Sequence, residues 1–481
     1  MKVLQGLEPA SVFGFFEDIC NIPHTSYHEQ KLSDYCVNFA KERNLYYEQD
    51  KMGNVIIIGE ATKGYEDVEP IMIQGHLDMV GDKLPGCQID MEKEPIQLMI
   101  DGDYLTADGT TLGGDDGIAV AYGLALLDAK DIEHPRLEVV LTVGEEVGLL
   151  GATEIDLSCC KAKRLLNIDS EEEDIFTVGC AGGVRADCKI PVETEMKSGV
   201  VCEVHSQGFL GGHSGMEINK GRASGNTMMG RFLMFLKERV SVDVISIVGG
   251  VKDNVIPKNV LAKLLVAKAD LETLKAALSE FHKYLDVEFA VSDPDIELVL
   301  EVKEEVQCEV LSACSKDKVI TALNLMPDGV QTMSMDLPGL VETSLNMGVI
   351  KIDTSEINLC FSVRSSLESA KEFVKTKLKQ LTESLGGTIS FRGDYPGWPY
   401  ARESKLRDLC VKIYKKQHGK EPKVEVIHAG LECGILSSKI EGLDCISVGP
   451  DMYDVHTPDE KISISSVGRV WEFLKAVLAE K

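Results

Sequence analysis

The chain has 481 residues, 44% of them hydrophobic, which is enough to bury a sizeable core and more than one domain. Its 78 acidic and 50 basic residues give a formal net charge of −28, which disfavours nucleic acids and anionic membrane surfaces as partners. The N-terminal sequence shows no signal-peptide pattern, and no apolar run approaches the roughly 18 residues of a membrane span. Because the 14 cysteines are scattered and give no disulfide framework, we expect a cytoplasmic protein.

Residues 1–182 alternate short apolar strand patterns with helical patterns. We expect helices at 9–21, 29–43 and 118–128, and strands at 55–58, 71–73, 137–143 and 165–168. Strands that alternate with helices in this way predict an α/β domain, with a mostly parallel sheet and helices on both faces.

The pattern changes after the glycine-rich stretch 178–184. Half-buried strands are expected at 200–204, 242–248, 261–267 and 357–363, and helices at 223–239, 271–285 and 366–385. Residues 242–285 and 344–385 share one order of elements, a weak sign of internal duplication. Helix–strand alternation resumes near Tyr395. We therefore predict a first part of the α/β domain at 1–182, an inserted α+β domain at 183–396, and a second part at 397–481.

Several of the expected strands end in a side chain that can bind a metal ion. In open α/β sheets, ligands gather beyond the carboxyl ends of the strands. One further pair of carboxylates lies in a glycine-rich turn that opens a helix, and one histidine follows a short strand near the C-terminus. These candidates are His76, Asp78, Asp115, Asp116, Glu145, Glu146, Asp169 and His456.

Each candidate also has an ordinary structural explanation. Asp115 or Asp116 alone is more often a helix N-cap, Asp169 could begin a solvated acidic loop, and His456 could be a surface histidine. Their coincidence on one predicted face of the sheet favours a metal site. Histidine and carboxylate without thiolate suit zinc, manganese or cobalt. Within this pattern a His, an Asp, a Glu, a second Asp and a second His give five candidate ligands. Five exceed what one tetrahedral ion uses, which indicates two ions about 3.5–4 Å apart.

The sequence also resembles a known family, the M20 co-catalytic metallopeptidases, which include aminoacylases, tripeptidases and Xaa-His dipeptidases. The resemblance runs nearly end to end, and within the family it is strongest to the aminoacyl-histidine dipeptidases, also called cytosol non-specific dipeptidases. The motifs that carry it, in order, are QGHLDMV, TLGGDDGIA, TVGEEVGLLGA, NIDSEE, GGHSG, NVIP, HAGLECGIL and VHTPDE.

The resemblance implies roles for the candidate ligands. His76 and Asp169 would hold one ion, Glu146 and His456 would hold the other, and Asp115 would bridge them. Asp78 would orient His76, and Asp116 would support the site or cap the helix. Glu145 would be the general base and acid, which takes a proton from a metal-bridging water and passes it to the leaving amine. The ions would be zinc, with manganese or cobalt as alternatives.

The resemblance also implies that the inserted domain is a lid that binds substrate. His213 would donate to the oxyanion of the reaction intermediate, although alone it could equally be a loop histidine. Asn254 and Arg364 would grip the substrate. The planar guanidinium of Arg364 matches a C-terminal carboxylate, but an arginine that ends a strand is usually a solvated residue. Glu432 would contact the substrate's amino group, and His428 would line the same pocket.

We therefore expect a dinuclear metal-dependent hydrolase of dipeptides with free termini, such as β-Ala-His. Two alternatives stay open: a tripeptidase, aminoacylase or other amide hydrolase of the same fold, and a catalytically silent metal or peptide binder. The expected partner is a small peptide substrate. A homodimer is an expectation from the family alone.

Overall fold

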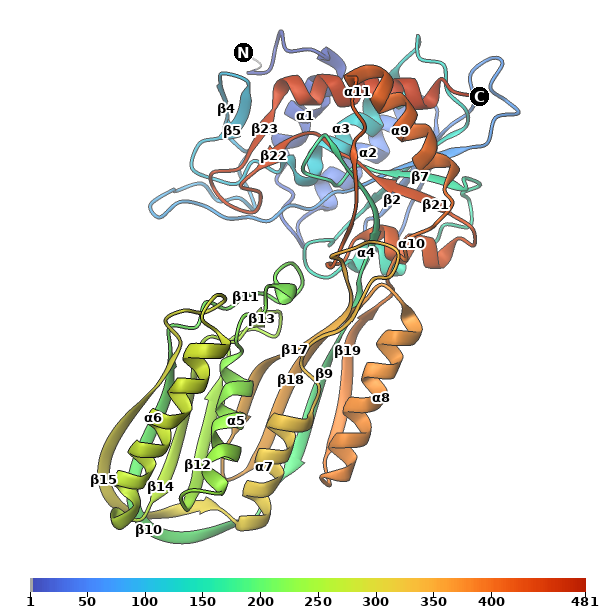
Figure 1. The fold of residues 1–481 in the computed structure, drawn as a ribbon. Coiled ribbons are helices and arrows are strands. Elements are labelled where there is room, and N and C mark those ends of the chain that lie inside the picture. The colour runs from blue at the N-terminus through green and yellow to red at the C-terminus, as the bar shows by residue number, and fades with distance from the viewer. Residues whose placement is uncertain (1–2) are drawn as a thin grey trace. The chain divides into compact units, whose positions relative to one another are not determined.

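The computed structural model describes residues 3–481, which form two compact units (Figure 1). The first unit contains the described residues up to Cys180, together with Tyr400–Val426 and Leu431–Lys481. The second contains Ala181–Pro399 and Ile427–Gly430. The sequence interpretation assigned 427–430 to the third segment of the chain, whereas the structure places these four residues in the second unit. Each unit has its own hydrophobic core.

The first unit is built on an eight-stranded sheet in the order β1-β2-β6-β3-β7-β21-β8-β20. Its four central strands, β6, β3, β7 and β21, are mutually parallel, whereas β1, β2 and β8 pair antiparallel with their neighbours. The parallel sheet expected from the sequence is therefore confirmed at the centre, and the flanks are antiparallel. The strands are β1 (Tyr46–Gln49), β2 (Val55–Gly59), β3 (Ile71–His76), β6 (Leu137–Thr142), β7 (Arg164–Asn167), β8 (Ile175–Cys180), β20 (Lys423–Ile427) and β21 (Asp444–Ser447).

Helices cover both faces of this sheet, as expected, and every residue of β2, β3 and β6 is buried. Gly75 faces α3, because a Cβ placed on it would lie 2.4 Å from the Cβ of Ala119. Its neighbour Gln74 points to the other face, where it donates a hydrogen bond to Glu432 at the start of α10. The helices of this unit are α1 (Ala10–Cys20), α2 (Gln30–Glu42), α3 (Gly114–Asp128), α4 (Leu150–Glu154), α9 (Lys405–His418), α10 (Glu432–Lys439) and α11 (Ile464–Leu478).

A small four-stranded sheet, absent from the sequence interpretation, completes the first unit. Its order is β22-β23-β5-β4. It joins a hairpin near residue 100 to the C-terminal segment, because β23 pairs antiparallel with β5. This pairing brings the segment with His456 next to the turn that precedes α3. The strands are β4 (Leu98–Asp101), β5 (Tyr104–Ala107), β22 (Met452–Tyr453) and β23 (Lys461–Ser463).

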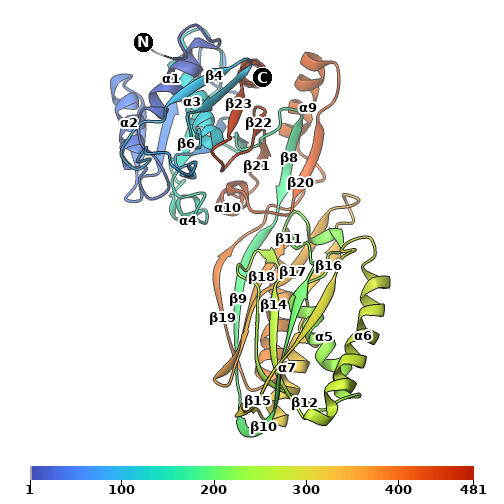
Figure 2. The same cartoon turned by 90° about the vertical axis from the view of Figure 1, so that its left-hand side faces the viewer.

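The second unit is a nine-stranded sheet with helices α5, α6, α7 and α8 on one face (Figures 1 and 2). The strand order is β15-β10-β14-β12-β17-β18-β9-β19, and β16 pairs with β17. All pairings that define this sheet are antiparallel. A two-stranded ribbon of β11 and β13 is separate from it.

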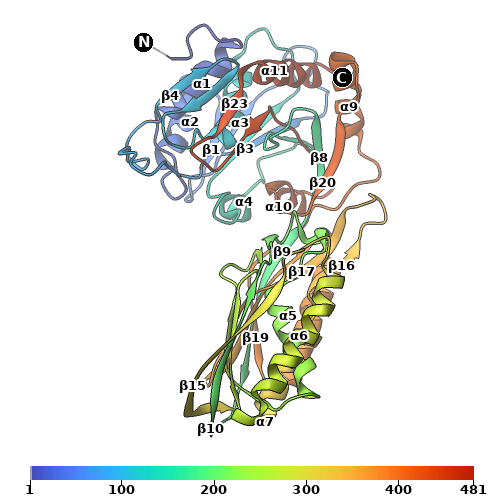
Figure 3. The ribbon, with the colours of Figure 1, turned by 60° about the vertical axis from the view of Figure 1, so that its left-hand side comes forward.

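Several strands of the second unit extend beyond the expected ranges, whereas two of its helices are slightly shorter than the expected 223–239 and 366–385; the long strands can be followed in Figure 3. The helices are α5 (Gly225–Lys237), α6 (Leu271–Glu288), α7 (Ala313–Leu325) and α8 (Glu368–Ser384), with 3-10 turns η1 (Ile218–Lys220) and η2 (Lys268–Asp270). The strands are β9 (Gly182–Pro191), β10 (Thr194–Gln207), β11 (Gly212–His213), β12 (Val242–Gly249), β13 (Val255–Ile256), β14 (Val260–Val266), β15 (Glu297–Leu311), β16 (Gly329–Met333), β17 (Val341–Ile352), β18 (Glu356–Ser365) and β19 (Thr388–Tyr395).

Three further findings concern the described residues as a whole. All fourteen cysteines are free thiols. In the described part of the chain, no helix combines the length and the apolar composition that crossing a membrane requires. The glycine-rich stretch 178–184 is mostly strand rather than loop. Gly182 and Gly183 occur there because a Cβ at either position would lie within 3 Å of the segment Tyr395–Gly397.

The packing of α3 on β3 predicts that Gly75→Ala destabilises the protein. The added methyl group would overlap both Ala119 and the carboxylate of Asp116, and overpacking of a core typically costs about 1–3 kcal/mol. Gly14→Ala is the matched control, because a Cβ at Gly14 in α1 meets nothing within 4 Å. That substitution is expected to stabilise the protein by about 0.5–1 kcal/mol. Urea unfolding measures both, and equal stabilities for the two variants would contradict the predicted packing.

Candidate active site

The carboxyl ends of the central strands meet at one edge of the first unit's sheet. β3 pairs in parallel register with β6 and β7, so that His76 lies beside Thr142 and Gln74 beside Asn167. The chain after each strand end carries the predicted ligands: Glu145 and Glu146 follow β6, and Asp169 follows β7. The sequence-predicted convergence of these side chains is therefore present in the structure.

The carboxylate of Asp115 lies between two histidines. Its Oδ1 is 3.1 Å from Nε2 of His76, and its Oδ2 is 3.0 Å from Nε2 of His456. His456 Nε2 also lies 2.7 Å from Oε1 of Glu146, and His76 Nε2 lies 3.9 Å from Oδ1 of Asp169. Each oxygen of Asp115 thus faces a different histidine, and each histidine has a second carboxylate beside it.

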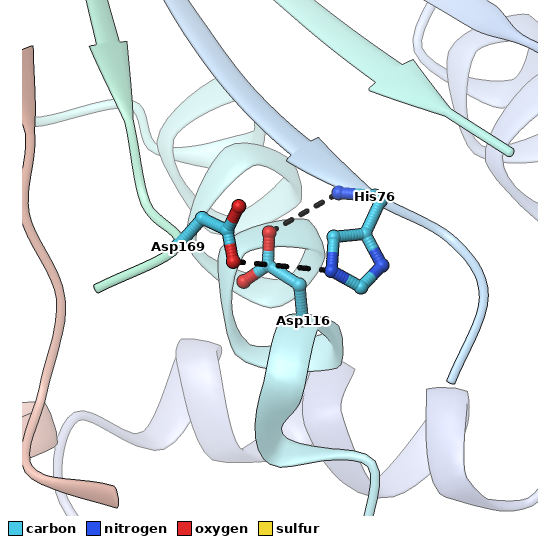
Figure 4. Close-up of side chains that lie close together, drawn as sticks. All are labelled: His76, Asp116 and Asp169. Atoms are coloured by element: carbon cyan, nitrogen blue, oxygen red, sulfur yellow. Dashed lines mark hydrogen bonds and ion pairs between the residues drawn. The ribbon is translucent and has the colours of Figure 1, made fainter. Parts of the chain in front are cut away.

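Asp116 lies on the inner side of this cluster, where it and Asp169 converge on His76 (Figure 4). Its Oδ2 accepts a hydrogen bond from the backbone N–H of His76 at 3.1 Å. Neither Asp115 nor Asp116 caps α3: the N-cap position is Gly113, which makes no side-chain cap, and both aspartates have non-helical backbone angles. The helix-capping role considered for Asp116 is therefore wrong, because its side chain holds the end of β3 instead.

Asp78 organises two parts of the cluster at once. Nδ1 of His76 donates to the backbone carbonyl of Asp78 at 2.9 Å and lies 3.4 Å from its carboxylate. This contact leaves Nε2 of His76 available as a ligand. The Asp78 carboxylate accepts from the backbone N–H groups of Glu145 and Glu146, at 2.9 and 3.2 Å, and from Ser26 Oγ at 2.8 Å. Asp78 thus fixes the backbone of both glutamates as well as the imidazole.

Burial and mutual repulsion shift the titration of these carboxyl groups. Burial, opposed by His76 and reinforced by Glu432, raises the pKa of Glu145 to about 8. Burial also raises the pKa of Asp116 and of Asp169. For Asp115, burial is outweighed by the two histidines, which hold its pKa below the usual range. The Asp115 and Glu146 carboxylates in turn raise the pKa of His456 to about 10.

These residues fit divalent cations. Three groups of ligand atoms each lie within 4.8 Å of one another: His76, Asp116 and Asp169; His76, Glu145 and Glu146; and Asp115, Glu146 and His456. Oδ1 of Asp116 and Oδ2 of Asp169 are buried and have no hydrogen-bond partner. Buried oxygens without donors are unfavourable unless a cation or ion pair compensates them. The donor set of imidazole and carboxylate suits zinc, manganese or cobalt.

A buried hydrogen-bond network links β3, β6 and β7 to α10. Glu432 is fully buried, and its Oε2 accepts from Gln74 and from Thr142 Oγ1. Gln74 Oε1 accepts from Asn167 at 2.7 Å. Burial raises the pKa of Glu432 to about 7. The other oxygen of Glu432, Oε1, is buried without a hydrogen-bond partner among the described residues, and the role at the substrate's amino group stays a prediction.

The predicted residues of the second unit form a cluster of their own. Gly215 lies between two of them, because a Cβ there would be 2.5 Å from the backbone oxygen of His428 and 3.0 Å from Cε1 of His213. Ser344 Oγ lies 2.7 Å from Nε2 of His428, and Ser344 is the direct cross-strand partner of Arg364. The backbone carbonyl of Asn254 accepts a hydrogen bond from the N–H of Ser214, next to His213.

Arg364 is the fixed positive charge of this second cluster. Its side chain is 9% exposed, its Nε is buried without a partner, and no carboxylate of residues 3–481 makes an ion pair with it. Burial, with the nearby Arg364, lowers the pKa of His428 to about 3 and also lowers the pKa of His213. A buried guanidinium with neutral histidines beside it is suited to bind an anion such as a carboxylate.

Sequence reasoning missed several residues that support these clusters. Ser26 binds Asp78 from a loop about fifty residues earlier, and Glu460 binds the turn before α3. Ser344 contacts His428 from β17. None of the three has a sequence spacing that points to its partner, although Glu460 lies in the VHTPDE motif that drew attention to His456.

Residues 204–293 match the peptidase dimerisation domain of the M20 family. The chain is 36% identical over 482 residues to the cytosol non-specific dipeptidase of Escherichia coli (strain K12), covering 100% of this chain and 99% of that protein. A crystal structure of aminoacylhistidine dipeptidase from Vibrio alginolyticus matches with a TM-score of 0.93 and 35% identity, covering 99% of this chain and 97% of that one. Aminopeptidase PepT from Bacillus cereus, 16% identical with a TM-score of 0.58 and 98% coverage of both chains, shares the fold.

The low pKa of His428 predicts a pH dependence of stability. The folded protein keeps this group neutral down to about pH 3, whereas an unfolded histidine titrates near 6.5. Between these values the unfolded state binds one more proton, so this contribution to stability is lost as pH falls from about 6.5 toward 3. His428→Gln, which can still hydrogen-bond Ser344, is expected to reduce the slope of unfolding free energy against pH by up to about 1.4 kcal/mol per unit. Urea unfolding at pH 5 and 6 tests this, and identical slopes for both proteins would refute it.

Proposed function

Because this chain belongs to the M20 peptidase family and is a dipeptidase, we propose that it hydrolyses dipeptides with free termini, including Xaa-His dipeptides such as β-Ala-His, with two bound divalent ions. The observation that carries the proposal is the position of Asp115, whose two carboxylate oxygens face His76 and His456 separately. A carboxylate arranged in this way is suited to bridge two cations, and a pair of cations is the arrangement of metal-assisted hydrolysis.

Each ion would have its own histidine and carboxylate. His76 and Asp169 would hold one ion, His456 and Glu146 the other, and Asp115 both. Zinc is the first candidate, with manganese and cobalt as alternatives, because the donor set accepts all three. When bound, such ions lower the pKa of a coordinated water and polarise a substrate carbonyl.

Glu145 would carry the proton. Its carboxyl group lies within the cluster beside Glu146, and burial raises its pKa to about 8. A carboxyl group that titrates near neutral pH can take a proton from the attacking water and give it to the leaving amine nitrogen. Asp78 would position it, because Asp78 holds the backbone N–H of Glu145 and orients His76.

The second unit, expected at 183–396, would act as a substrate-binding lid. Arg364 would bind the C-terminal carboxylate, His213 would donate to the developing oxyanion, and Asn254 and His428 would line the pocket. The burial of Arg364 without a carboxylate partner supports this assignment. Glu432 would act on the substrate's amino group only if the buried network around it opened, so this assignment is the least supported by the geometry.

The cellular setting is proposed by analogy with the relatives. A cytoplasmic location is consistent with the name of the Escherichia coli relative, and a homodimer is consistent with the dimerisation-domain match. The alternative activities, a tripeptidase or aminoacylase, predict hydrolysis of tripeptides or N-acetyl amino acids with none of free dipeptides. A silent binder predicts metal content without hydrolysis of any of these substrates.

The deciding experiment replaces Glu145 by glutamine and adds metal back to the apo-protein. Glu145→Gln is expected to retain both ions but to lower kcat for β-Ala-His by about 10²–10⁴-fold, the usual contribution of general acid–base catalysis. Glu154→Gln, at an exposed position of α4, is the matched control and is expected to keep wild-type activity. Isothermal titration calorimetry measures how many ions bind, and a ninhydrin assay measures turnover. A fully active Glu145→Gln enzyme would contradict the assignment of Glu145 as the general base and acid.

Arg364→Met tests recognition of the free carboxylate. Loss of a charge-assisted contact is expected to lower kcat/KM for β-Ala-His by roughly 10- to 100-fold. The same substitution should leave the kcat/KM for the C-terminal amide of that dipeptide nearly unchanged, because the amide offers Arg364 no negative charge. Steady-state kinetics of the wild type and the variant on both substrates measures the coupling between Arg364 and the substrate carboxylate. An equal loss of kcat/KM on both substrates would contradict a role of Arg364 in binding that carboxylate.

A further inference from the structure

Glu460 is a buried carboxylate that the proposed chemistry leaves without a role. It precedes β23, four residues after His456, and is 2% exposed. Its two oxygens accept hydrogen bonds from four consecutive backbone N–H groups, and no Lys or Arg among residues 3–481 makes an ion pair with it. The bonds run to Oε2 from Leu112 (2.7 Å) and Gly113 (3.0 Å), and to Oε1 from Gly114 (2.8 Å) and Asp115 (3.4 Å).

The turn that Glu460 binds is shaped to receive an anion. Gly113 has a left-handed backbone, with φ of 72°, and successive N–H groups in such a turn converge to form an anion-binding concavity. In this protein the anion is a side chain of the same unit. The last of the four donors is the N–H of Asp115, the residue whose side chain lies between His76 and His456.

Glu460 itself belongs to the segment that carries His456. Thr106 Oγ1 donates to the backbone carbonyl of Glu460 at 2.7 Å, which fastens the segment to β5. Asp454 and His456 both have left-handed backbone angles, with φ of 54° and 64°. Non-glycine residues keep this conformation only where the surroundings enforce it. His456 is also the most exposed of the five proposed ligands, with a side chain 46% exposed against at most 10% for the other four.

We propose that Glu460 is a positioning residue that fixes the Asp115 turn against the His456 segment, and thereby sets the affinity of the ion held by Asp115, Glu146 and His456. The inference rests on the proposed binding of two ions, but not on the identity of the substrate. His76 and Asp169 are held by β3 and β7, which Glu460 does not touch. The ion on their side would share Asp115 but would keep two ligands that Glu460 does not touch, whereas the other ion would depend on both of the segments that Glu460 joins. The first ion should therefore depend less on Glu460.

The test is a metal titration of the apo-protein and its Glu460→Gln variant. Glutamine has the same size as glutamate, but its side-chain NH2 group cannot accept a hydrogen bond from the backbone N–H groups of the turn. Supporting contacts of this kind typically change metal affinity by 10–100-fold when removed. We expect titration with Mn²⁺ to show one site within threefold of wild type and the second weakened by 10–100-fold. The kcat for β-Ala-His should recover at high Mn²⁺, with unchanged KM for the dipeptide.

Glu138→Gln is the matched control. Glu138 is also fully buried and also binds backbone N–H groups, those of Lys161 and Ala162. It differs in its ion pair with Arg136, and it lies near the start of β6, away from the ligands. Loss of a buried carboxylate should lower the Tm of both apo-variants, whereas only Glu460→Gln should weaken the second ion. If Glu460→Gln does not fold, Glu460→Asp keeps the charge but is one methylene too short to reach all four donors, and it should show the same selective weakening.

Two results would overturn the proposal: wild-type affinity for both ions in the Glu460 variant, or equal weakening of both ions in the Glu460 and Glu138 variants. Failure of the proposed function looks different. A wild-type protein that binds two ions but hydrolyses no dipeptide would refute the dipeptidase activity, while the selective effect of Glu460 on the second ion would still stand.

Discussion

The structure of the first unit depends on one electrostatic constraint, the burial of several carboxylates at a single edge of a sheet. Parallel strands place their carboxyl ends together, so the sequence cannot deliver His76, Glu145, Glu146 and Asp169 without bringing like charges close. Their repulsion and desolvation are relieved only by protonation, histidines or bound cations. Asp115 shows this directly, because each of its oxygens faces a histidine. Folding of this edge and binding of metal are therefore linked.

The two adjacent glutamates, Glu145 and Glu146, have different surroundings. Glu146 lies 2.7 Å from His456. The Glu145 carboxylate is near His76 and Glu146, and its pKa is raised mainly by burial. What keeps the neighbours apart is backbone geometry: Asp78 accepts both of their N–H groups and so fixes the turn after β6. A single aspartate thus orients one ligand through its carbonyl and two acidic residues through its carboxylate.

The ligand cluster could be predicted from sequence because it depends on a short-range regularity, a polar residue directly after a buried strand. The supporting contacts could not. Ser26, Ser344 and Glu460 each bind a partner that is distant in the chain, and no periodicity links such positions. For Glu432 the motif predicted a substrate contact, and the fold adds what the sequence could not indicate: the residue is buried and hydrogen-bonded to Gln74 of β3 and Thr142 of β6. In the second unit, β15 and α7 were missed. In the edge strand β15, a run of five exposed residues that includes Lys303, Glu304 and Glu305 interrupts the alternation and hides the strand pattern.

The two units bury opposite charges. The first unit concentrates negative charge that requires cations, while the second holds a buried arginine whose neighbouring histidines are kept neutral. If those histidines were protonated, Arg364 would face two like charges and the anion site would bind carboxylates without discrimination. With them neutral, the proposed recognition of a carboxylate would depend on the one guanidinium of Arg364, whose charge favours a carboxylate over an uncharged amide. On that proposed role, the free C-terminus of a peptide, rather than any side chain, would be what the second unit selects.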